Sequence, residues 1–124
     1  MSTTELERPA AVVPVQRRPA PLPGGARWRE LLEQRWRDRL QEVTELSVEF
    51  HEAGTAVQEQ RPPQTSLQQL MRRAVVARRG LADVDDALDR LAAGDYGRCE
   101  RCAQAIGAER LIVVPEERYC QHCA

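Results

Sequence analysis

The chain has 124 residues, a formal net charge of −1, 30% charged residues and 42% hydrophobic ones. This length fits one small domain with a tail, not two independent hydrophobic cores. No apolar run approaches the roughly 18 residues that cross a membrane, and the N-terminus lacks the apolar segment of an export signal. The charge balance argues against a protein held on nucleic acid by a basic surface. We therefore expect a cytoplasmic protein with no membrane partner and no sequence-specific DNA binding.

Residues 1–25 contain most of the prolines, and their one apolar cluster is a short Ala/Val run at 10–13. Such a segment buries too little surface to offset the entropy lost on ordering. We predict a disordered tail over 1–25, either a solvated leader or a tail that binds a partner.

A first helical pattern begins at Ala26 and is free of Gly and Pro to about Ala53. Its apolar side chains recur at steps of three and four, which places them on one helix face. They are Leu32, Trp36, Leu40, Val43, Leu46, Phe50 and Ala53. Gly54 and the pair Pro62-Pro63 then predict a turn over about 54–65, with frayed helix as the alternative for part of it.

The second helical pattern has apolar residues spaced alternately three and four apart, which is a heptad seam. They are Leu67, Leu70, Ala74, Ala77, Leu81, Val84, Leu88 and Leu91. Thr65 or Ser66 can cap its start, and Gly94 is placed to end it. We predict a long antiparallel helical hairpin (coiled coil) over 26–94, although such a seam can also assemble between chains.

Charges support this alignment. In a hairpin that turns near residue 60, facing residues have numbers that sum to about 120. Three arginines then lie beside three aspartates, and three glutamates beside four arginines. These are Arg35, Arg37 and Arg39 with Asp83, Asp85 and Asp86, and Glu42, Glu45 and Glu49 with Arg72, Arg73, Arg78 and Arg79. Exposed pairs contribute about 0–1 kcal/mol each, so they set alignment more than stability, and the alternative is solvated faces.

Residues 95–124 carry all four cysteines in the pattern Cys-x2-Cys-x17-Cys-x2-Cys. Two such tight turns complete a tetrahedron of thiolates around Zn²⁺, and disulfides are rare without export. We predict one structural zinc in a small C4 ribbon, bound by Cys99, Cys102, Cys120 and Cys123. A closed shell leaves no position for a reactive water, so we expect no enzyme. His122 is the one alternative ligand, and is otherwise exposed or adjacent to the site.

Further side chains have expected roles around this module. The run 109–115 is predicted to hold a short strand whose Leu111, Ile112 and Val113 pack the module onto the hairpin base. Arg98 and Arg101 are placed to offset the negative charge of a zinc tetrathiolate. We expect Trp28 and Trp36 to pack at the hairpin base and His51 to lie at the surface.

A further hypothesis for the function is a redox sensor that loses its zinc when the cysteines are oxidised.

The chain resembles the DksA/TraR family of bacterial regulators over about residues 30–124. The resemblance lies in the hairpin followed by Asp95-Tyr96-Gly97-x-Cys99-x-x-Cys102, Ile106-Gly107, Arg110-Leu111, Pro115 and Cys120-x-x-Cys123. It implies a structural zinc and a hairpin that binds RNA polymerase rather than DNA. In the best-known members the hairpin tip reaches the catalytic centre through the secondary channel, sometimes together with ppGpp. The resemblance leaves a ppGpp response of this chain open.

The hairpin tip departs from the pattern of active members, which is Asp-x-x-Asp-x-Ala. Counting back from Cys99 places Ala56, Glu59 and Arg61 at these three positions. The acidic pair is therefore reduced to Glu59. The alternative function is a zinc-stabilised interaction adaptor with another partner, whose contact surface would be Arg72, Arg73, Arg78 and Arg79.

Overall fold

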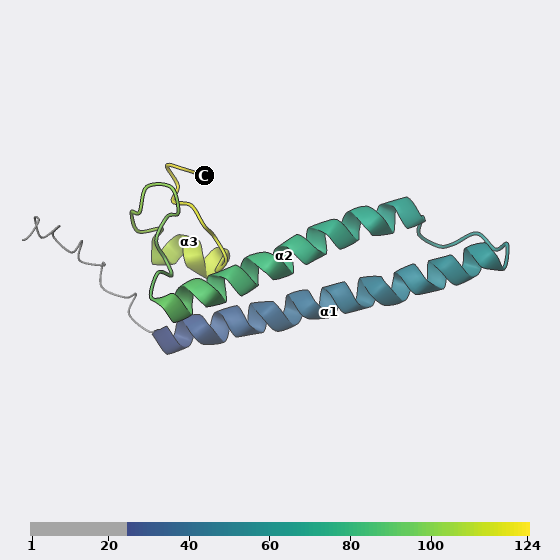
Figure 1. Cartoon of the computed structure of the whole chain (residues 1–124), viewed down its shortest axis with the longest axis horizontal. Coiled ribbons are helices and arrows are strands. Elements are labelled where there is room, and N and C mark those ends of the chain that lie inside the picture. Colours follow the sequence, from purple (N-terminus) through teal and green to yellow (C-terminus); the bar gives the residue numbers. More distant parts are fainter. Residues whose placement is uncertain (1–24) are drawn as a thin grey trace, which may run out of the picture.

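The computed structural model describes residues 25–124 and consists of two long helices and one short helix. Helix α1 spans Gly25–Gln58, α2 spans Leu67–Ala93 and α3 spans Ala108–Val113. Figure 1 shows α1 and α2 side by side in a hairpin, with α3 and the C-terminal loops beside the end of α2. The predicted mostly helical hairpin with a C-terminal cysteine module is confirmed. Of the tail predicted to be disordered over 1–25, residues 1–24 lie outside the described part. Gly25 is helical, so the prediction is wrong for that residue.

Helix α1 is longer than predicted, because it continues through Gly54 to Gln58. A helical glycine costs only about 1 kcal/mol, and burial of Ala53 and Ala56 on either side of it favours continuation. The chain turns just after the helix at Gln60, whose φ is 59°, and the Arg61 N–H donates to the Ala56 carbonyl at 2.7 Å. The predicted start of the turn at Gly54 is therefore wrong.

Helix α2 has the predicted caps. The Ser66 hydroxyl accepts a hydrogen bond from the Gln69 N–H at 3.1 Å, and Gly94 ends the helix in the left-handed conformation with φ 82°. The eight seam positions are all buried or half-buried, and Leu70, Ala77 and Val84 are at most 1% exposed. The heptad seam is thus used within the chain.

The hairpin is held by two separate apolar clusters. The base cluster packs both helices against the cysteine module and includes Trp28, Leu32, Val84, Tyr96 and Leu111. The tip cluster joins the two helices alone and contains Leu46, Ala53, Leu70 and Ala77. Trp28 and Trp36 both lie at the base as predicted, since Trp36 packs against the base cluster.

Contacts between the helices confirm the alignment but not every charge partner. The Trp36 Nε1 donates to Asp85 at 2.7 Å, and Arg73 pairs with Glu49 at 3.2 Å, so facing residue numbers sum to 121 and 122. The prediction that Arg35 lies beside the aspartates of α2 is wrong, because Arg35 pairs with Glu116 of the cysteine module. Within residues 25–124, no helix has the length and apolarity of a membrane span.

Candidate metal centre and hairpin tip

The structure brings the four predicted cysteine ligands together. The Sγ atoms of Cys99, Cys102, Cys120 and Cys123 all lie within 4.8 Å of one another, and those of Cys102 and Cys120 are 3.6 Å apart. In a tetrahedral zinc site with Zn–S bonds of about 2.3 Å, the sulfurs are about 3.8 Å apart. The cluster therefore has the size and donor set of a tetrathiolate metal site.

Two tight backbone turns present these thiols. In the first, the Ala103 N–H donates to the Cys99 carbonyl at 2.9 Å, and the Cys99 N–H donates to the Gln104 carbonyl at 2.8 Å. Ala103 adopts φ 63°, the left-handed region that favours glycine. In the second, the N–H groups of Cys123 and Ala124 both donate to the Cys120 carbonyl, at 3.0 and 2.9 Å. Each turn places its two thiols on one side of the chain.

The thiols cannot all ionise without a compensating charge. Burial raises the pKa of the Cys99 thiol, but backbone N–H groups of Cys120, Cys102 and Arg101 outweigh it and lower the pKa to about 6. The pKa of Cys123 rises to about 12, because its thiol hydrogen-bonds to Cys120 and is itself desolvated. A divalent cation among the sulfurs stabilises all four thiolates together, which fits the geometry to a metal.

The cluster is partly embedded in the base of the hairpin. Cys99 and Cys120 are 2% and 4% exposed and belong to the base cluster, whereas Cys102 is exposed. His122 is exposed and lies outside the group of sulfurs, as predicted for a residue that is not a ligand. Arg101 lies over the Tyr119 ring, 5.7 Å from its centroid. That Arg98 and Arg101 offset thiolate charge stays a prediction.

The segment between the two cysteine pairs is helical rather than extended. Helix α3 occupies Ala108–Val113, so the strand predicted over 109–115 is wrong. Because successive helical residues point about 100° apart, only Leu111 of the three predicted apolar anchors is fully buried. Ile112 and Val113 are 57% and 72% exposed, which corrects their predicted packing on the hairpin base.

The structure reveals an anchor that the sequence analysis missed, a buried ion pair between α1 and the loop after α3. Arg35 donates from Nε and Nη2 to the two carboxylate oxygens of Glu116, at 3.0 and 2.7 Å. Glu116 is only 9% exposed, and burial raises the pKa of its carboxyl group. Hydrogen bonds from Arg35 outweigh this effect and lower the pKa below its ordinary value.

A second missed anchor is Arg118, which contacts α2 and the first cysteine turn. Its guanidinium donates to Asp83 at 3.0 Å, to Asp86, and to Glu100 at 3.1 Å. These carboxylates raise the pKa of Arg118 above its ordinary value. Neither anchor was visible in the sequence, where Glu116 and Arg118 are two charges in a mixed run.

An aromatic contact completes the junction. The Tyr96 hydroxyl donates to the Pro115 carbonyl at 2.9 Å, and its ring lies 5.8 Å from the Trp28 ring. Burial raises the pKa of Tyr96 to about 12, so this hydroxyl remains a donor at neutral pH. Tyr96, which precedes the first cysteine turn, thereby contacts both the start of α1 and the loop after α3.

The hairpin tip carries the second set of predicted site residues. The Arg61 guanidinium donates to the Glu59 carboxylate through both Nε, at 2.8 Å, and Nη2. Both side chains are more than half exposed. The single tip acid is therefore paired within the chain. A shallow groove of about 660 Å³ lies beside it, lined from both helices and by Pro62 and Pro63. His51 is exposed on this rim, as predicted for a surface residue.

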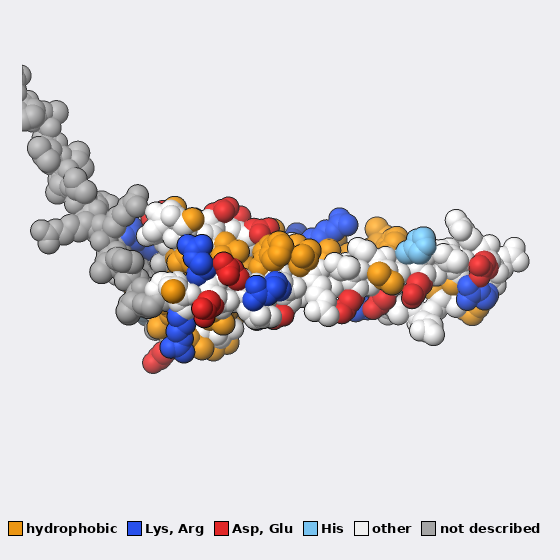
Figure 2. Space-filling view, turned by 90° about the horizontal axis from the view of Figure 1, so that it is seen from below, with side chains coloured by type: hydrophobic (Ala, Val, Ile, Leu, Met, Phe, Trp, Pro, Cys, Tyr) orange, Lys and Arg blue, Asp and Glu red, His pale blue; other side chains and the backbone are white. Residues whose placement is uncertain are grey.

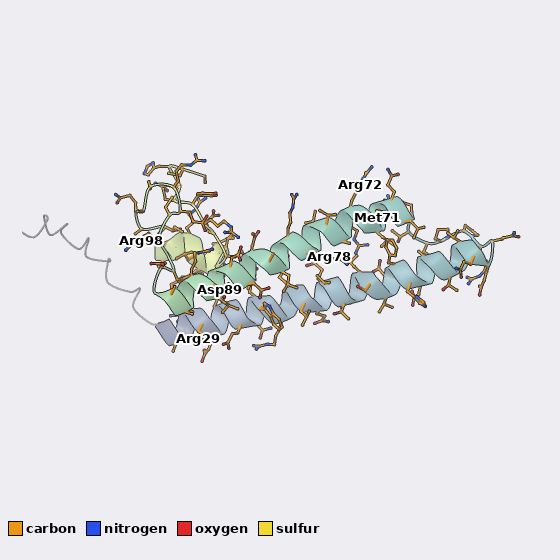
Figure 3. All side chains as sticks on the ribbon, in the orientation of Figure 1. Arg29, Met71, Arg72, Arg78, Asp89 and Arg98 are labelled. Carbon is orange, nitrogen blue, oxygen red and sulfur yellow. The ribbon has the colours of Figure 1, made fainter. Side chains whose placement is uncertain are left out.

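The four predicted contact arginines of α2 do not form one patch. All four are exposed, but Arg73 pairs with Glu49 across the hairpin and Arg78 lines a different, apolar groove. In Figure 3, Arg72 points away from α1, whereas Arg78 lies on the side of α2 nearer α1. Among residues 25–124, Arg72, Arg78 and Arg79 make no ion pair.

Comparison with known proteins places the fold. No known family's sequence pattern matches the chain. An uncharacterized protein of Aquifex aeolicus is 46% identical over 44 residues, which span 36% of this chain and only 30% of that protein. The solved structure of the transcription factor DksA2 from Pseudomonas aeruginosa matches with a TM-score of 0.66 at 24% identity, covering 80% of this chain and 78% of DksA2. The chain therefore has the fold of DksA2, and its own four cysteines form a cluster with the size and donor set of a tetrathiolate metal site.

Proposed function

We propose that this chain is a DksA/TraR-like zinc-finger transcription regulator that binds RNA polymerase through its helical hairpin rather than DNA. The observation that carries the proposal is the likeness to DksA2, which covers both the hairpin and the cysteine module. The hairpin presents a free tip at the end opposite the module (Figure 1), as an element that inserts into a partner requires. Two of the module's four arginines, Arg110 and Arg118, are paired with acids, which lowers the positive charge that the module offers to DNA.

The metal of the proposed regulator is one structural Zn²⁺. Cys99, Cys102, Cys120 and Cys123 would hold it, and its charge would stabilise the four thiolates in the fold. Four protein ligands close the coordination shell, so the proposal includes no catalytic role. Purified protein is expected to contain one zinc per chain, and Cys99→Ser is expected to lower that content. Metal-free protein with native helicity and a native module would contradict this role.

The tip sets how the chain would act on the polymerase. Glu59 stands where the family carries an acid, but Arg61 holds its carboxylate. The position of the other family acid is Ala56, which carries no charge and is 6% exposed. We therefore propose binding in which the tip carries less free negative charge than in the acidic-tip members.

The test is binding of the zinc-loaded full chain to purified core RNA polymerase of its own organism, measured for wild type, Glu59→Ala and Arg61→Ala. Glu59→Ala is expected to weaken binding if the tip engages the enzyme. Arg61→Ala frees the acid and is expected to strengthen binding or leave it unchanged. Glu33→Ala, an exposed acid on α1 near the base, is the matched control and should have no effect. Absence of binding at about 10 μM, a generous concentration for a specific complex, would contradict the proposal.

One observation favours the adaptor alternative, namely that the tip acid is single and already paired. In that case the fold is shared with DksA2 and the partner differs. The same purified chain would then fail to bind polymerase, and binding to another protein would depend on the exposed arginines of α2. The fourfold variant in which Arg72, Arg73, Arg78 and Arg79 are all replaced by Ala tests that dependence.

A further inference from the structure

One side of the hairpin is apolar at its surface, and the contacts among residues 25–124 leave it uncovered. A groove of about 380 Å³ runs between the helices on this side. It is lined equally from α1 and α2, by Val43, Leu46, Ser47 and Phe50 and by Met71, Ala74, Val75 and Arg78. Phe50, Met71 and Val75 are 39%, 58% and 54% exposed. Figure 2 shows hydrophobic side chains reaching the surface along the middle of the hairpin.

The groove side continues toward the hairpin base. By helical spacing Leu40, which is 38% exposed, and Ala82 extend it by about one turn on each helix. Among the described residues that line the groove, Arg78 is the only charged one. The next charged residue along this side of α2 is Asp85, which accepts the hydrogen bond of Trp36. The cysteine module contacts the hairpin through Arg35, Asp83 and Asp86, which are on other faces of the two helices. The module therefore leaves the groove side open.

We propose that a second copy of this chain covers the groove side, so that two hairpins pack face to face as a four-helix bundle. Because the groove receives four residues from each helix, a two-fold axis along the hairpins places α1 of one copy on α2 of the other. Residues at one level have numbers that sum to about 121, so Phe50 of each copy meets Met71 of the other. Neighbouring helices are then antiparallel throughout, as in four-helix bundles.

The area is sufficient for such a dimer. The face from Trp36 to Gly54 is about 27 Å long and two adjacent helices are about 20 Å wide. Packing it on both copies covers on the order of 1,100 Å², near the lower limit of specific interfaces. A self-complementary apolar face explains why α2 carries Met71 and Val75 beside its seam, whereas the opposite side of the hairpin carries ion pairs such as Glu49–Arg73. Since interfaces at this lower limit belong to weak complexes, we expect a dimer that forms in the micromolar range.

The test is analytical ultracentrifugation of the zinc-loaded full chain from about 1 to 200 μM, a range that spans the expected weak affinity. Wild type is expected to shift from monomer to dimer. Val75→Glu places a carboxylate in the apolar interface and is expected to raise the dissociation constant at least about tenfold. Val76→Glu is the matched control, because Val76 is 69% exposed on α2 but does not line the groove. It should leave the dissociation constant unchanged.

Helicity measured by circular dichroism distinguishes lost dimers from lost folding. If Val75→Glu unfolds, Ala82→Glu serves as the second variant on the same side. The proposal is overturned if wild type stays monomeric at 200 μM, a concentration well above that expected for the dimer, or if Val75→Glu and the control Val76→Glu change the dissociation constant equally. It does not depend on polymerase binding, since the measurement uses the chain alone.

Discussion

The buried ion pair between Arg35 and Glu116 should be a main connection between the hairpin and the cysteine module. Replacing Arg35 by Ala leaves a carboxylate that is 9% exposed without its two hydrogen bonds. Breaking a buried pair in this way costs about 3–5 kcal/mol. Arg35 is itself 32% exposed, and Arg39 lies 3.9 Å from the same carboxylate as a partial substitute. We therefore expect a smaller loss, about 2 kcal/mol in the free energy of unfolding.

The assay is urea unfolding at pH 7 with saturating zinc, followed by circular dichroism. Arg37→Ala is the matched control, because Arg37 is exposed and bonds only to Gln34 among the described residues; it should cost less than about 0.5 kcal/mol. In a double-mutant cycle, Glu116→Ala with Arg35→Ala should cost less than the sum of the single variants. Equal effects of Arg35→Ala and Arg37→Ala would refute the reasoning.

The same pair predicts a pH dependence. The pKa of Glu116 is lowered in the folded chain, so its pairing with Arg35 stabilises the fold at neutral pH. This contribution is lost as the pH falls through the lowered pKa, because the carboxylate then gains a proton. The stability difference between wild type and Arg35→Ala should therefore shrink from pH 7 toward pH 4. A difference that grows over this range would contradict the assignment.

Four further predictions concern single backbone positions and the metal. Ala103→Gly removes the strain of φ 63° and should stabilise the module by about 1 kcal/mol, measured by thermal unfolding; destabilisation would contradict the turn geometry. Gly54→Ala should stabilise α1 by up to about 1 kcal/mol, since nothing lies within 4 Å of the added Cβ. Gly80→Ala should gain less in the same urea assay, because its Cβ would meet the Arg39 side chain at 3.3 Å. Removal of zinc with a chelator should expose amide hydrogens of residues 95–124 to exchange, and unchanged protection there would contradict a structural metal.

Features set by local sequence could be predicted. The seam of α2 is a regular spacing of apolar residues, and its end at Gly94 follows from the glycine's free access to the left-handed region. The two cysteine pairs could be assigned to one site because each pair forms its own tight turn. In each case the residues that decide the structure are close together in the chain, so one sequence is enough to recognise them.

Features set by tertiary contacts could not be predicted. Gly54 usually weakens a helix, but burial of Ala53 and Ala56 continues α1 through it. The run containing Leu111 has the apolar side chains of a strand. Only Leu111 is buried in the core, however, and the short helix α3 is enough to place it there. Arg35 had plausible acidic partners on α2, and only the folded module brings Glu116 closer.

The separation of the two apolar clusters bears on how the metal could influence the tip. Cys99 and Cys120 belong to the base cluster, whereas Leu46 and Leu70 of the tip cluster are in the other half of the hairpin. Both clusters are joined only by the continuous helices α1 and α2, since α3 and the cysteine turns contact the base. Metal loss should thus loosen the base and change how the hairpin is oriented relative to the module, while the tip retains its own packing. A partner that grips only the tip would tolerate such loss, whereas one that also contacts the module would not, so the zinc dependence of binding distinguishes these two modes of engagement.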